Sequence, residues 1–222
     1  MLDANASWTP EIGGDVRREN EILKRENQKL MRKLVSVSRR AVAANRMAHH
    51  DVLTGLPNRL LLIKRLQRAI AEAFQRQMLL ALLFIDLDGF KEVNDRFGHK
   101  VGDRLLSVVA ARIAASVRAD DVACRYGGDE FIVLLANVDE PAIAVSIAQK
   151  IREQIGRRYW INGHVIQVSA SIGLAIYPAD GERYDVLLSH ADAAMYRSKA
   201  ARRTLGARSM SPAPAGTDDR IR

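Results

Sequence analysis

Cysteine and long apolar runs are what this sequence most clearly lacks. Cys124 is its single cysteine, which excludes an internal disulfide framework and is typical of a reducing compartment. The longest nearly uninterrupted apolar run, MLLALLFI at 78–85, is too short to span a bilayer. The opening MLDANASWTP also lacks the basic and apolar regions of a secretory signal. We therefore expect a cytoplasmic protein without a membrane span.

Glycine and proline are absent from residues 15–48, so nothing there would interrupt a helix. Apolar residues and asparagines recur in this stretch at alternating spacings of four and three, the pattern of a heptad seam. Asn20 and Asn27 fall at a positions, where asparagine favours parallel two-stranded coils. The d positions are then Val16, Leu23, Leu30 and Val37. We predict that residues 15–50 form a dimerising coiled-coil stalk; the alternative is a lone amphipathic helix packed on its own domain.

Acidic residues are too few to balance the basic ones, and the net charge is +8. Residues 15–50 hold ten basic and four acidic residues, a net of +6, which raises nucleic acid as a partner. Basic-zipper DNA binders place a dense basic run ahead of the zipper. Here the basic residues lie within and after the seam, so we expect no sequence-specific nucleic-acid binding.

Beyond the stalk, strand and helix patterns alternate. Gly55 and Pro57 in DVLTGLPNR end the stalk, and a helix follows to about residue 77. The later elements are a buried strand LLALLFIDLD, helices near 91–96 and 101–117, a hairpin, a helix near 140–158, a strand at 165–177 and a helix at 184–205. This order predicts an α+β fold, with a mixed, mainly antiparallel central sheet flanked by helices.

The chain divides into four parts on these grounds. We expect a flexible N-terminal tail at 1–14, the stalk at 15–50, a globular domain at 51–205, and a disordered tail at 206–222 that is rich in proline, glycine and serine. Beside the helix, the residues before the globular domain are too few for a sensory domain. We therefore expect a separate regulatory protein to bind the tail or stalk, with Trp8 and Ile22 as contacts.

Two glycines and two carboxylates stand together in RYGGDEF at 125–131, between two runs that are typical of strands. Gly127 and Gly128 are a turn signal, because glycine reaches positive φ without steric cost. The turn does not explain Asp129 and Glu130, since adjacent like charges repel unless a cation lies between them. The motif therefore indicates more than a hairpin.

A second acidic motif, FIDLDGFKEVND, places Asp86 and Asp88 where a buried strand ends. A strand end beside a hairpin tip can bring Asp86 close to Asp129 and Glu130. Mg²⁺ prefers hard oxygen ligands and commonly binds one or two carboxylates together with substrate phosphates. These residues therefore predict a divalent-metal and phosphate site.

Five motifs in fixed order carry a family resemblance: DVLTGLPNR, FIDLDGFKEVND, FGHKVGD, RYGGDEF and ADAAMYRSKAARR. Together they resemble the GGDEF family of diguanylate cyclases over about residues 51–203. The resemblance implies a palm-like fold related to nucleotidyl cyclases and polymerases. It also implies condensation of two GTP molecules into cyclic di-GMP, with release of two pyrophosphates.

The resemblance assigns the acidic residues to metal binding and catalysis. Asp86, Asp129 and the carbonyl of Leu87 are expected to ligate Mg²⁺ or Mn²⁺. Glu130 is expected to be a metal ligand or the general base for the attacking 3′-hydroxyl. Two ions of this kind activate the nucleophile and neutralise the leaving pyrophosphate.

The resemblance also assigns substrate contacts. Asn94 and Asp103 match the pair that recognises guanine, and a carboxylate at Asp103 accepts hydrogens that adenine lacks. Phe90, Gly127 and Gly128 complete the nucleotide site, and the matched phosphate-binding cations are Lys91, Lys199 and Arg203. Family members usually have Gly-Arg-Asn where this chain has Arg202-Arg203-Thr204, so either arginine could reach the phosphates.

Arg118 and Asp121 in RADDVAC match the family's RxxD inhibitory site, at the expected distance from Gly127. Such a site binds intercalated cyclic di-GMP through bidentate arginine contacts, so the resemblance implies product inhibition. Lys150 or Arg152 is expected to supply a second contact.

A single GGDEF domain holds one GTP and hence half an active site. We therefore expect a homodimer or a higher homo-oligomer assembled through the stalk, which raises the local concentration of the second domain. The alternative function is a catalytically inactive GGDEF module that senses nucleotide. Such modules usually carry a damaged signature, whereas the acidic residues are intact here.

Overall fold

The computed structural model describes the backbone of residues 10–209 and the side chains of residues 18–40 and 42–202. It divides into two compact units between Ala48 and His49, and each is described here by itself. Trp8 and the other residues of 1–9 lie outside the described part, as do residues 210–222 of the predicted C-terminal tail.

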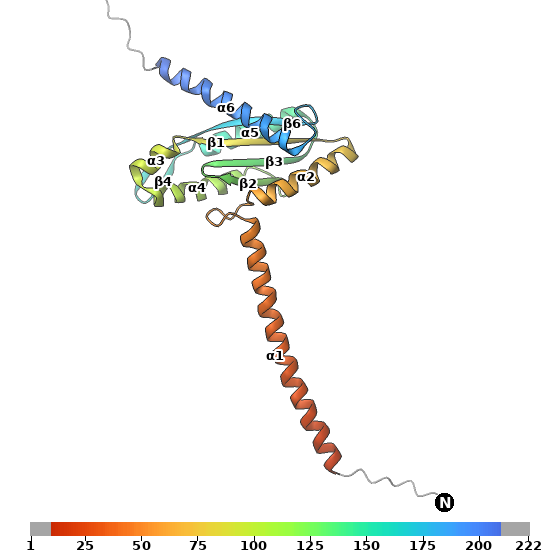
Figure 1. Cartoon of the computed structure of the whole chain (residues 1–222). Helices are drawn as coiled ribbons and strands as arrows, with labels where there is room; N and C mark the ends of the chain where they lie inside the picture. Colours follow the sequence, from red (N-terminus) through yellow and green to blue (C-terminus); the bar gives the residue numbers. More distant parts are fainter. Residues whose placement is uncertain (1–9, 210–222) are drawn as a thin grey trace, which may run out of the picture. The chain divides into compact units, whose positions relative to one another are not determined.

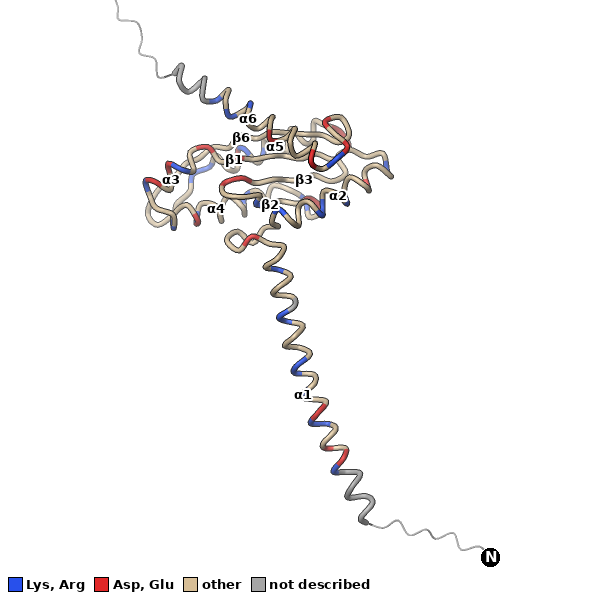
Figure 2. Tube along the Cα trace, viewed as in Figure 1, with Lys and Arg blue, Asp and Glu red and all other residues tan. Residues whose placement is uncertain are grey.

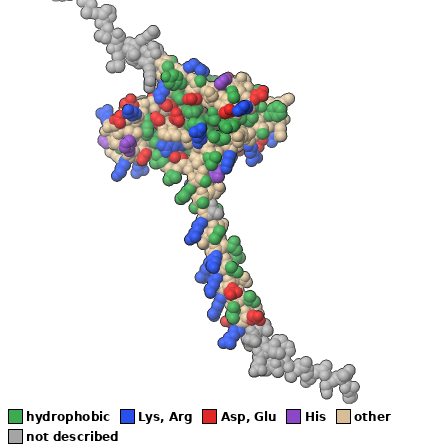
Figure 3. All heavy atoms as spheres, viewed as in Figure 1, with side chains coloured by type: hydrophobic (Ala, Val, Ile, Leu, Met, Phe, Trp, Pro, Cys, Tyr) green, Lys and Arg blue, Asp and Glu red, His purple; other side chains and the backbone are tan. Residues whose placement is uncertain are grey.

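The first unit is one continuous helix, α1 (Pro10–His49), shown in Figure 1. The helix begins five residues before the predicted stalk, so the predicted tail at 1–14 is too long. Pro10 suits the first helical turn, because a backbone N–H at that position would have no partner within the helix. Its described apolar side chains are exposed, as Figure 3 shows along its length. They are Ile22, Leu23, Leu30, Met31, Leu34, Val35, Val37, Val42 and Met47.

Charge is distributed unequally along α1. Figure 2 shows acidic residues only in its N-terminal half, while basic residues continue to its other end. No helix in the described part of the chain combines the length and the apolarity needed to cross a membrane.

The second unit is built on a four-stranded sheet in the order β2-β3-β1-β6. Its strands are β1 (Leu79–Asp88), β2 (Val122–Gly127), β3 (Glu130–Val138) and β6 (Ser169–Tyr177). All three strand pairs are antiparallel. β1 lies in the interior of the sheet and is buried from Leu80 to Leu87, which explains its nearly continuous apolar sequence.

Helices cover both faces of the sheet, because side chains alternate along each strand. Leu83 and Ile85 of β1 join the core with α3 (Phe90–Phe97), α4 (His99–Ala114) and α5 (Pro141–Ile155). Leu82 and Phe84 join the opposite core with α2 (Arg59–Arg76) and α6 (Tyr184–Ser209). The predicted α+β architecture, a sheet flanked by helices, is confirmed. α6 extends beyond the predicted end at 205, and α4 stops three residues before 117.

The predicted strand at 165–177 is wrong as a single element. Its first part is β5 (His164–Ile166), which pairs with β4 (Tyr159–Ile161) in a separate hairpin, and only β6 joins the main sheet. Asn162 and Gly163 form the turn with φ of 49° and 82°. Asn-Gly suits such a turn because both residues adopt positive φ readily.

Gly173 in β6 allows α6 to pack directly on the sheet. A Cβ added there would overlap the backbone of Ala191 and Met195. The glycine inside the predicted strand therefore marks close backbone approach rather than a break.

Candidate active site

The two acidic motifs meet on neighbouring strands. Asp86 of β1 lies directly opposite Glu130 of β3, and the backbone N–H of Leu87 donates to the carbonyl of Asp129 at 3.4 Å. The turn residues between β2 and β3 are Gly128 and Asp129, because Gly127 still pairs with Glu130. The predicted Gly127-Gly128 turn is thus one residue out of register, and Gly128 alone has positive φ, at 49°.

Lys199 approaches these carboxylates from α6. Its Nζ donates to Oδ1 of Asp86 at 2.6 Å, and Asp86 is only 8% exposed. A pocket of about 440 Å³ opens beside this ion pair. Its lining residues are Asp86, Glu130, Asp192, Met195, Tyr196, Lys199 and Ala200. The predicted phosphate-binding lysine and the predicted metal ligand therefore contact each other.

The carboxylates of the turn are held in an environment that disfavours their charge. Burial raises the pKa of Asp129, and the nearby charge of Asp86 adds to the effect although the backbone N–H of Asp129 opposes it. Burial also raises the pKa of Glu130, with further contributions from Asp86 and Asp129. A cation placed among these groups would offset both effects.

The oxygen ligands at this end of the sheet are of the type that a divalent ion takes together with substrate phosphates. Among the described residues, no three His, Cys, Asp or Glu side chains form a group that could hold a metal. Asp86, Asp129 and Glu130 thus lie near one another without forming a closed set of ligands, and Lys199 pairs with Asp86. Mg²⁺ does not require a closed protein cage, because it commonly retains water and takes substrate oxygens beside one or two carboxylates. The hard oxygens of Asp86, Asp129 and Glu130 match that requirement.

The predicted guanine-recognition residues lie at the junction of α3 and α4. Asn94 lies on α3, and a Cβ added to Gly102 of α4 would overlap its Oδ1 and approach the ring of Phe90. The missing side chain at Gly102 therefore lets Asn94 pack directly against α4, one residue before Asp103 in the sequence. The role of Gly102 was not predicted, although it stands in the FGHKVGD motif. Lys91 is exposed on α3.

A comparison with known protein families covers the whole of this region. The family described as "Diguanylate cyclase, GGDEF domain" matches residues 48–204 of this chain. The chain belongs to the GGDEF family. That region contains all the acidic residues named above and ends before the predicted C-terminal tail.

Two curated GGDEF relatives come from Pseudomonas aeruginosa. The bifunctional diguanylate cyclase/cyclic di-GMP phosphodiesterase MucR is 52% identical over 154 residues, which are 69% of this chain and 22% of MucR. The diguanylate cyclase TpbB is 44% identical over 153 residues, which are 68% of this chain and 35% of TpbB. The chain thus spans about a third or less of the length of either relative.

Solved GGDEF structures show the same fold. The GGDEF domain of TpbB has a TM-score of 0.68 at 44% identity and covers 69% of this chain and 90% of that one. The coiled coil and GGDEF domain of DgcB from Caulobacter crescentus, in complex with c-di-GMP, has a TM-score of 0.73 at 27% identity and covers 81% of this chain and 95% of that one. The diguanylate cyclase SiaD of Pseudomonas aeruginosa, in complex with its activator SiaC, has a TM-score of 0.67 at 28% identity and covers 86% of this chain and 77% of that one.

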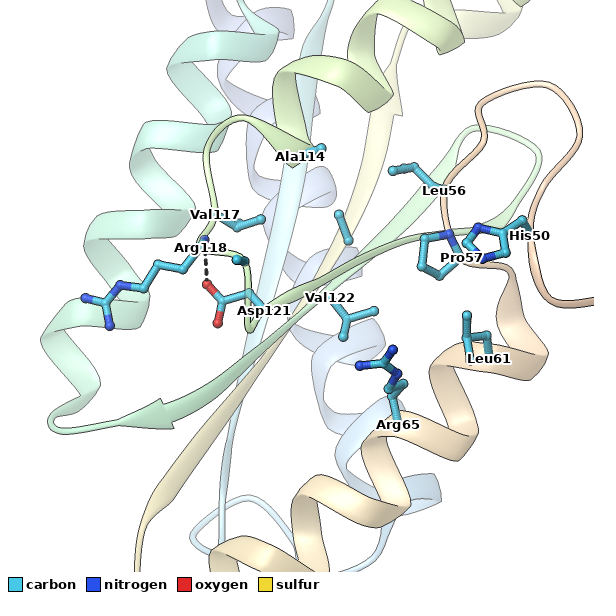
Figure 4. A pocket seen from close by; sticks show the side chains of 12 residues that line it. His50, Leu56, Pro57, Leu61, Arg65, Ala114, Val117, Arg118, Asp121 and Val122 are labelled. Atoms are coloured by element: carbon cyan, nitrogen blue, oxygen red, sulfur yellow. Dashed lines mark hydrogen bonds between the residues drawn. The ribbon is translucent and has the colours of Figure 1, made fainter. Parts of the chain in front are cut away.

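The RxxD residues of this GGDEF domain form a tight turn before β2. The backbone N–H of Arg118 donates to Oδ2 of Asp121 at 2.9 Å, and that of Ala136 donates to Oδ1 at 3.2 Å. Figure 4 shows the first bond and the side chain of Arg118 pointing away from His50 and Pro57. Asp121 therefore fixes the turn, and the guanidinium of Arg118 is presented outside it.

Arg118 also borders a pocket of about 500 Å³ together with Lys150 of α5. The Nζ of Lys150 donates to the carbonyl of Ser116 at 3.0 Å, which holds it near the RxxD turn. Arg152 does not line this pocket; Asp88 and Arg202 act on its charge instead. Of the two predicted second contacts, Lys150 is the one that the fold brings to Arg118.

Arg125 is a site residue whose role was not predicted. Its Nη1 donates to both carboxylate oxygens of Asp51 at 3.1 and 3.2 Å, while its Nε and Nη2 donate to the carbonyl of Gly128 at 3.0 and 2.8 Å. Burial opposes ionisation of Asp51, but hydrogen bonds from Thr54 and Arg125 outweigh it and lower the pKa of this carboxyl. One side chain thus ties the DVLTGLPNR segment to the turn before Asp129.

The C-terminal arginines are only partly described. The side chain of Arg203 lies outside the described residues, so its predicted phosphate contact stays a prediction. The Nη1 of Arg202 donates to Oδ2 of Asp88 at 3.3 Å. Lys199 and Arg202, three residues apart on α6, therefore contact Asp86 and Asp88, two residues apart on β1.

Proposed function

We propose that the chain is a diguanylate cyclase, which condenses two GTP molecules into cyclic di-GMP and releases two pyrophosphates. The observation that supports this most directly is the placement of Asp86 opposite Glu130, with Asp129 in the adjoining turn and Lys199 beside them. Acidic ligands for a divalent ion and a cation for phosphate then lie at one end of the sheet. The family membership and the names of MucR and TpbB point to the same chemistry.

Asp86, Asp129, Glu130 and the carbonyl of Leu87 would hold Mg²⁺ or Mn²⁺ in this proposal. When bound, the ions supply charge stabilisation at the α-phosphate and at the leaving pyrophosphate. Glu130, whose pKa is raised by burial and by the nearby Asp86 and Asp129, would take the proton of the attacking 3′-hydroxyl. Lys199 would leave Asp86 and contact the phosphates as the nucleotide binds.

Guanine recognition falls to Asn94 and Asp103 at the junction of α3 and α4. Asp103 would accept the N1 and N2 hydrogens of guanine, and Asn94 would bond the same base edge. Phe90, Gly127 and Gly128 border the nucleotide, the glycines because they let its phosphates approach the backbone. Lys91, Lys199 and Arg203 are the proposed phosphate cations.

Catalysis requires a second copy of the chain, because each domain presents one GTP to the other. Residues 15–50 are the proposed parallel coiled coil. This proposal is supported by the exposed apolar side chains along α1. A long helix with such side chains is poorly stable alone, and a partner helix would bury them. The DgcB structure includes a coiled coil, and SiaD was solved with an activator. By analogy we propose that a regulatory protein binds this stalk, and that the dimer is the smallest active assembly.

Product inhibition is proposed at Arg118, Asp121 and Lys150. The exposed guanidinium of Arg118 and the ammonium of Lys150 border one pocket, where they suit the phosphates of cyclic di-GMP. Adding cyclic di-GMP should slow the wild-type enzyme, whereas Arg118→Ala should remove most of the effect. Equal inhibition of both proteins would contradict this site.

The deciding experiment incubates the purified chain with GTP and Mg²⁺ or Mn²⁺ and identifies the products by mass. The wild type should make cyclic di-GMP and pyrophosphate. Glu130→Gln should make neither, while Glu182→Gln, an exposed carboxylate on the loop before α6, should match the wild type.

Absence of product calls for a second protein in which an engineered stable zipper replaces residues 15–48. Turnover by that protein would support the cyclase and assign the defect to dimerisation. A forced dimer that binds GTP and stays inactive would instead support the nucleotide-sensing module.

A further inference from the structure

The β4–β5 hairpin carries an exposed apolar pair. Trp160 of β4 lies directly opposite Val165 of β5, and the two residues are 75% and 58% exposed. Side chains alternate along a strand, so Tyr159 and Ile161 point to the other face, where both are buried. A tryptophan that is three-quarters exposed projects from the surface instead of lining a groove. The outer face of this hairpin is therefore a protruding apolar surface.

The hairpin is anchored to the domain at its base and beside its turn. The guanidinium of Arg112 on α4 lies over the ring of Tyr159, 3.8 Å from the centroid. Its N–H groups also donate to three backbone carbonyls of residues 154–158, each at 2.9 Å. The ring centroids of Phe97, the last residue of α3, and His164, beside the turn, lie 4.9 Å apart, and Figure 1 shows β4 next to α3. The apolar pair is therefore held on a packed support.

Basic residues accompany the apolar pair. Arg157 and Arg158 directly precede β4 and are exposed, and the alternation of the strand places Arg158 on the outer face. The sequence has no acidic residue from 154 to 179. The neighbouring helix α4 adds the exposed Lys100 and Arg104. Within the described residues, none of these four cations forms an ion pair, so their charge is available to an anionic ligand.

An anionic lipid surface suits both the apolar and the basic groups. Tryptophan is enriched at membrane–water interfaces, where its ring is partly buried and its N–H stays hydrated. Lys and Arg beside such a ring are attracted to anionic headgroups. A single-stranded nucleic acid would stack on the indole of Trp160 but gain nothing from Val165. A folded protein partner would require more apolar area than these two side chains supply, because stable interfaces bury about 800 Å² on each partner.

We propose that the outer face of the β4–β5 hairpin docks on an anionic lipid surface. Trp160 and Val165 enter the boundary between headgroups and acyl chains, while Arg157 and Arg158 contact the lipid phosphates. The contact is peripheral, because a hairpin of two three-residue strands reaches only the interface. It involves none of the carboxylates or cations of the proposed cyclase site, so it stands or falls independently of the proposed function.

The test mixes the full chain with phosphatidylcholine vesicles that either contain or lack phosphatidylserine. Trp8→Phe in every protein leaves Trp160 as the sole tryptophan, so its fluorescence reports this hairpin alone. The emission should shift to shorter wavelength with the phosphatidylserine vesicles, and added salt should reduce the shift by screening the charges. Vesicle flotation then measures the affinity of variants. Trp160→Ser should weaken binding about tenfold or more, and Arg157→Gln and Arg158→Gln about fivefold each.

Phe74→Ser and Arg76→Gln on α2 are the matched controls, since Phe74 is also 75% exposed and Arg76 is an exposed arginine; both should leave binding nearly unchanged. Circular dichroism checks the folding of each variant. An unshifted Trp160 emission with phosphatidylserine vesicles would overturn the proposal without any further variant. Binding that Trp160→Ser and the arginine variants retain would assign it to the basic residues of α1 and overturn the hairpin site. A shift caused by single-stranded DNA but not by vesicles would make the hairpin a nucleic-acid surface instead.

Discussion

The ion pair between Asp51 and Arg125 should stabilise the folded domain, and its burial and the lowered pKa of Asp51 predict both the size and the pH dependence of that contribution. Asp51→Asn keeps an oxygen for the Thr54 hydrogen bonds but removes the charge that Arg125 contacts. Exposed ion pairs contribute about 0.2–1 kcal/mol, whereas breaking a buried pair costs about 3–5 kcal/mol. The Arg125 and Asp51 side chains are 14% and 24% exposed, between those limits. We therefore expect the substitution to lower the free energy of unfolding by about 2 kcal/mol at neutral pH.

The pH dependence follows from the lowered pKa of Asp51. A carboxyl whose folded pKa lies below its ordinary value of 3.8 stabilises the folded state above that value, and this contribution disappears as the pH falls through the folded pKa. The deficit of Asp51→Asn should therefore be constant near neutrality and shrink below about pH 4.

Urea unfolding followed by circular dichroism measures this deficit. A slope of about 1–3 kcal/mol/M places the midpoint of Asp51→Asn roughly 1 M below that of the wild type at pH 7.5. Asp120→Asn, at an exposed carboxylate, is the control and should show no shift. An unshifted midpoint for Asp51→Asn at pH 7.5, or a deficit that stays the same down to pH 3, would refute the reasoning.

Three further predictions concern the same domain. Lys199→Met should weaken GTP binding at least tenfold yet strengthen Mn²⁺ binding to the nucleotide-free protein, since it frees Asp86; calorimetry showing both affinities falling together would contradict this. Gly173→Ala should cost about 2–3 kcal/mol in urea unfolding, because its Cβ overlaps the backbone of Ala191, and an unchanged midpoint would count against that packing. Cys124 is fully buried and its pKa is raised to about 12, so a thiol reagent at pH 8 should label it only after unfolding; rapid labelling of the native protein would show that this thiol is accessible.

The main sheet was predictable from the sequence because its signals are local and strong. The run from Leu79 to Asp88 is apolar without alternation, as expected of a strand covered on both faces. The β4–β5 hairpin was missed because its strands are three residues long and their exposed positions include the apolar residues Trp160 and Val165. The burial of these strands therefore leaves no apolar/polar alternation in the sequence. Its one clear local signal was the Asn162-Gly163 turn.

The acidic residues of the site were predictable as a set, but their partners were not. Arg125 pairs with a residue 74 positions earlier, and Lys199 with one 113 positions earlier. Such pairs depend on which strands become neighbours and on their register, neither of which a local pattern specifies. The same limit explains why the contact of Lys199 with Asp86 was not predicted.

The alignment of β1 with β3 carries a consequence for evolution and design of this chain. Their pairing runs without interruption from Ala81 to Asp86, and its irregularity lies at the far end, between Leu79 and Ala81. A one-residue slip would turn Glu130 to the opposite face from Asp86 while leaving both residues in place in the sequence. The apolar residues that fix the register of β1 and β3 therefore also fix the relative positions of Asp86 and Glu130. One-residue insertions should be tolerated near Leu79 and Val138, where the pairing is already irregular. Between Ala81 and Asp86 they should abolish activity, because they would shift the register.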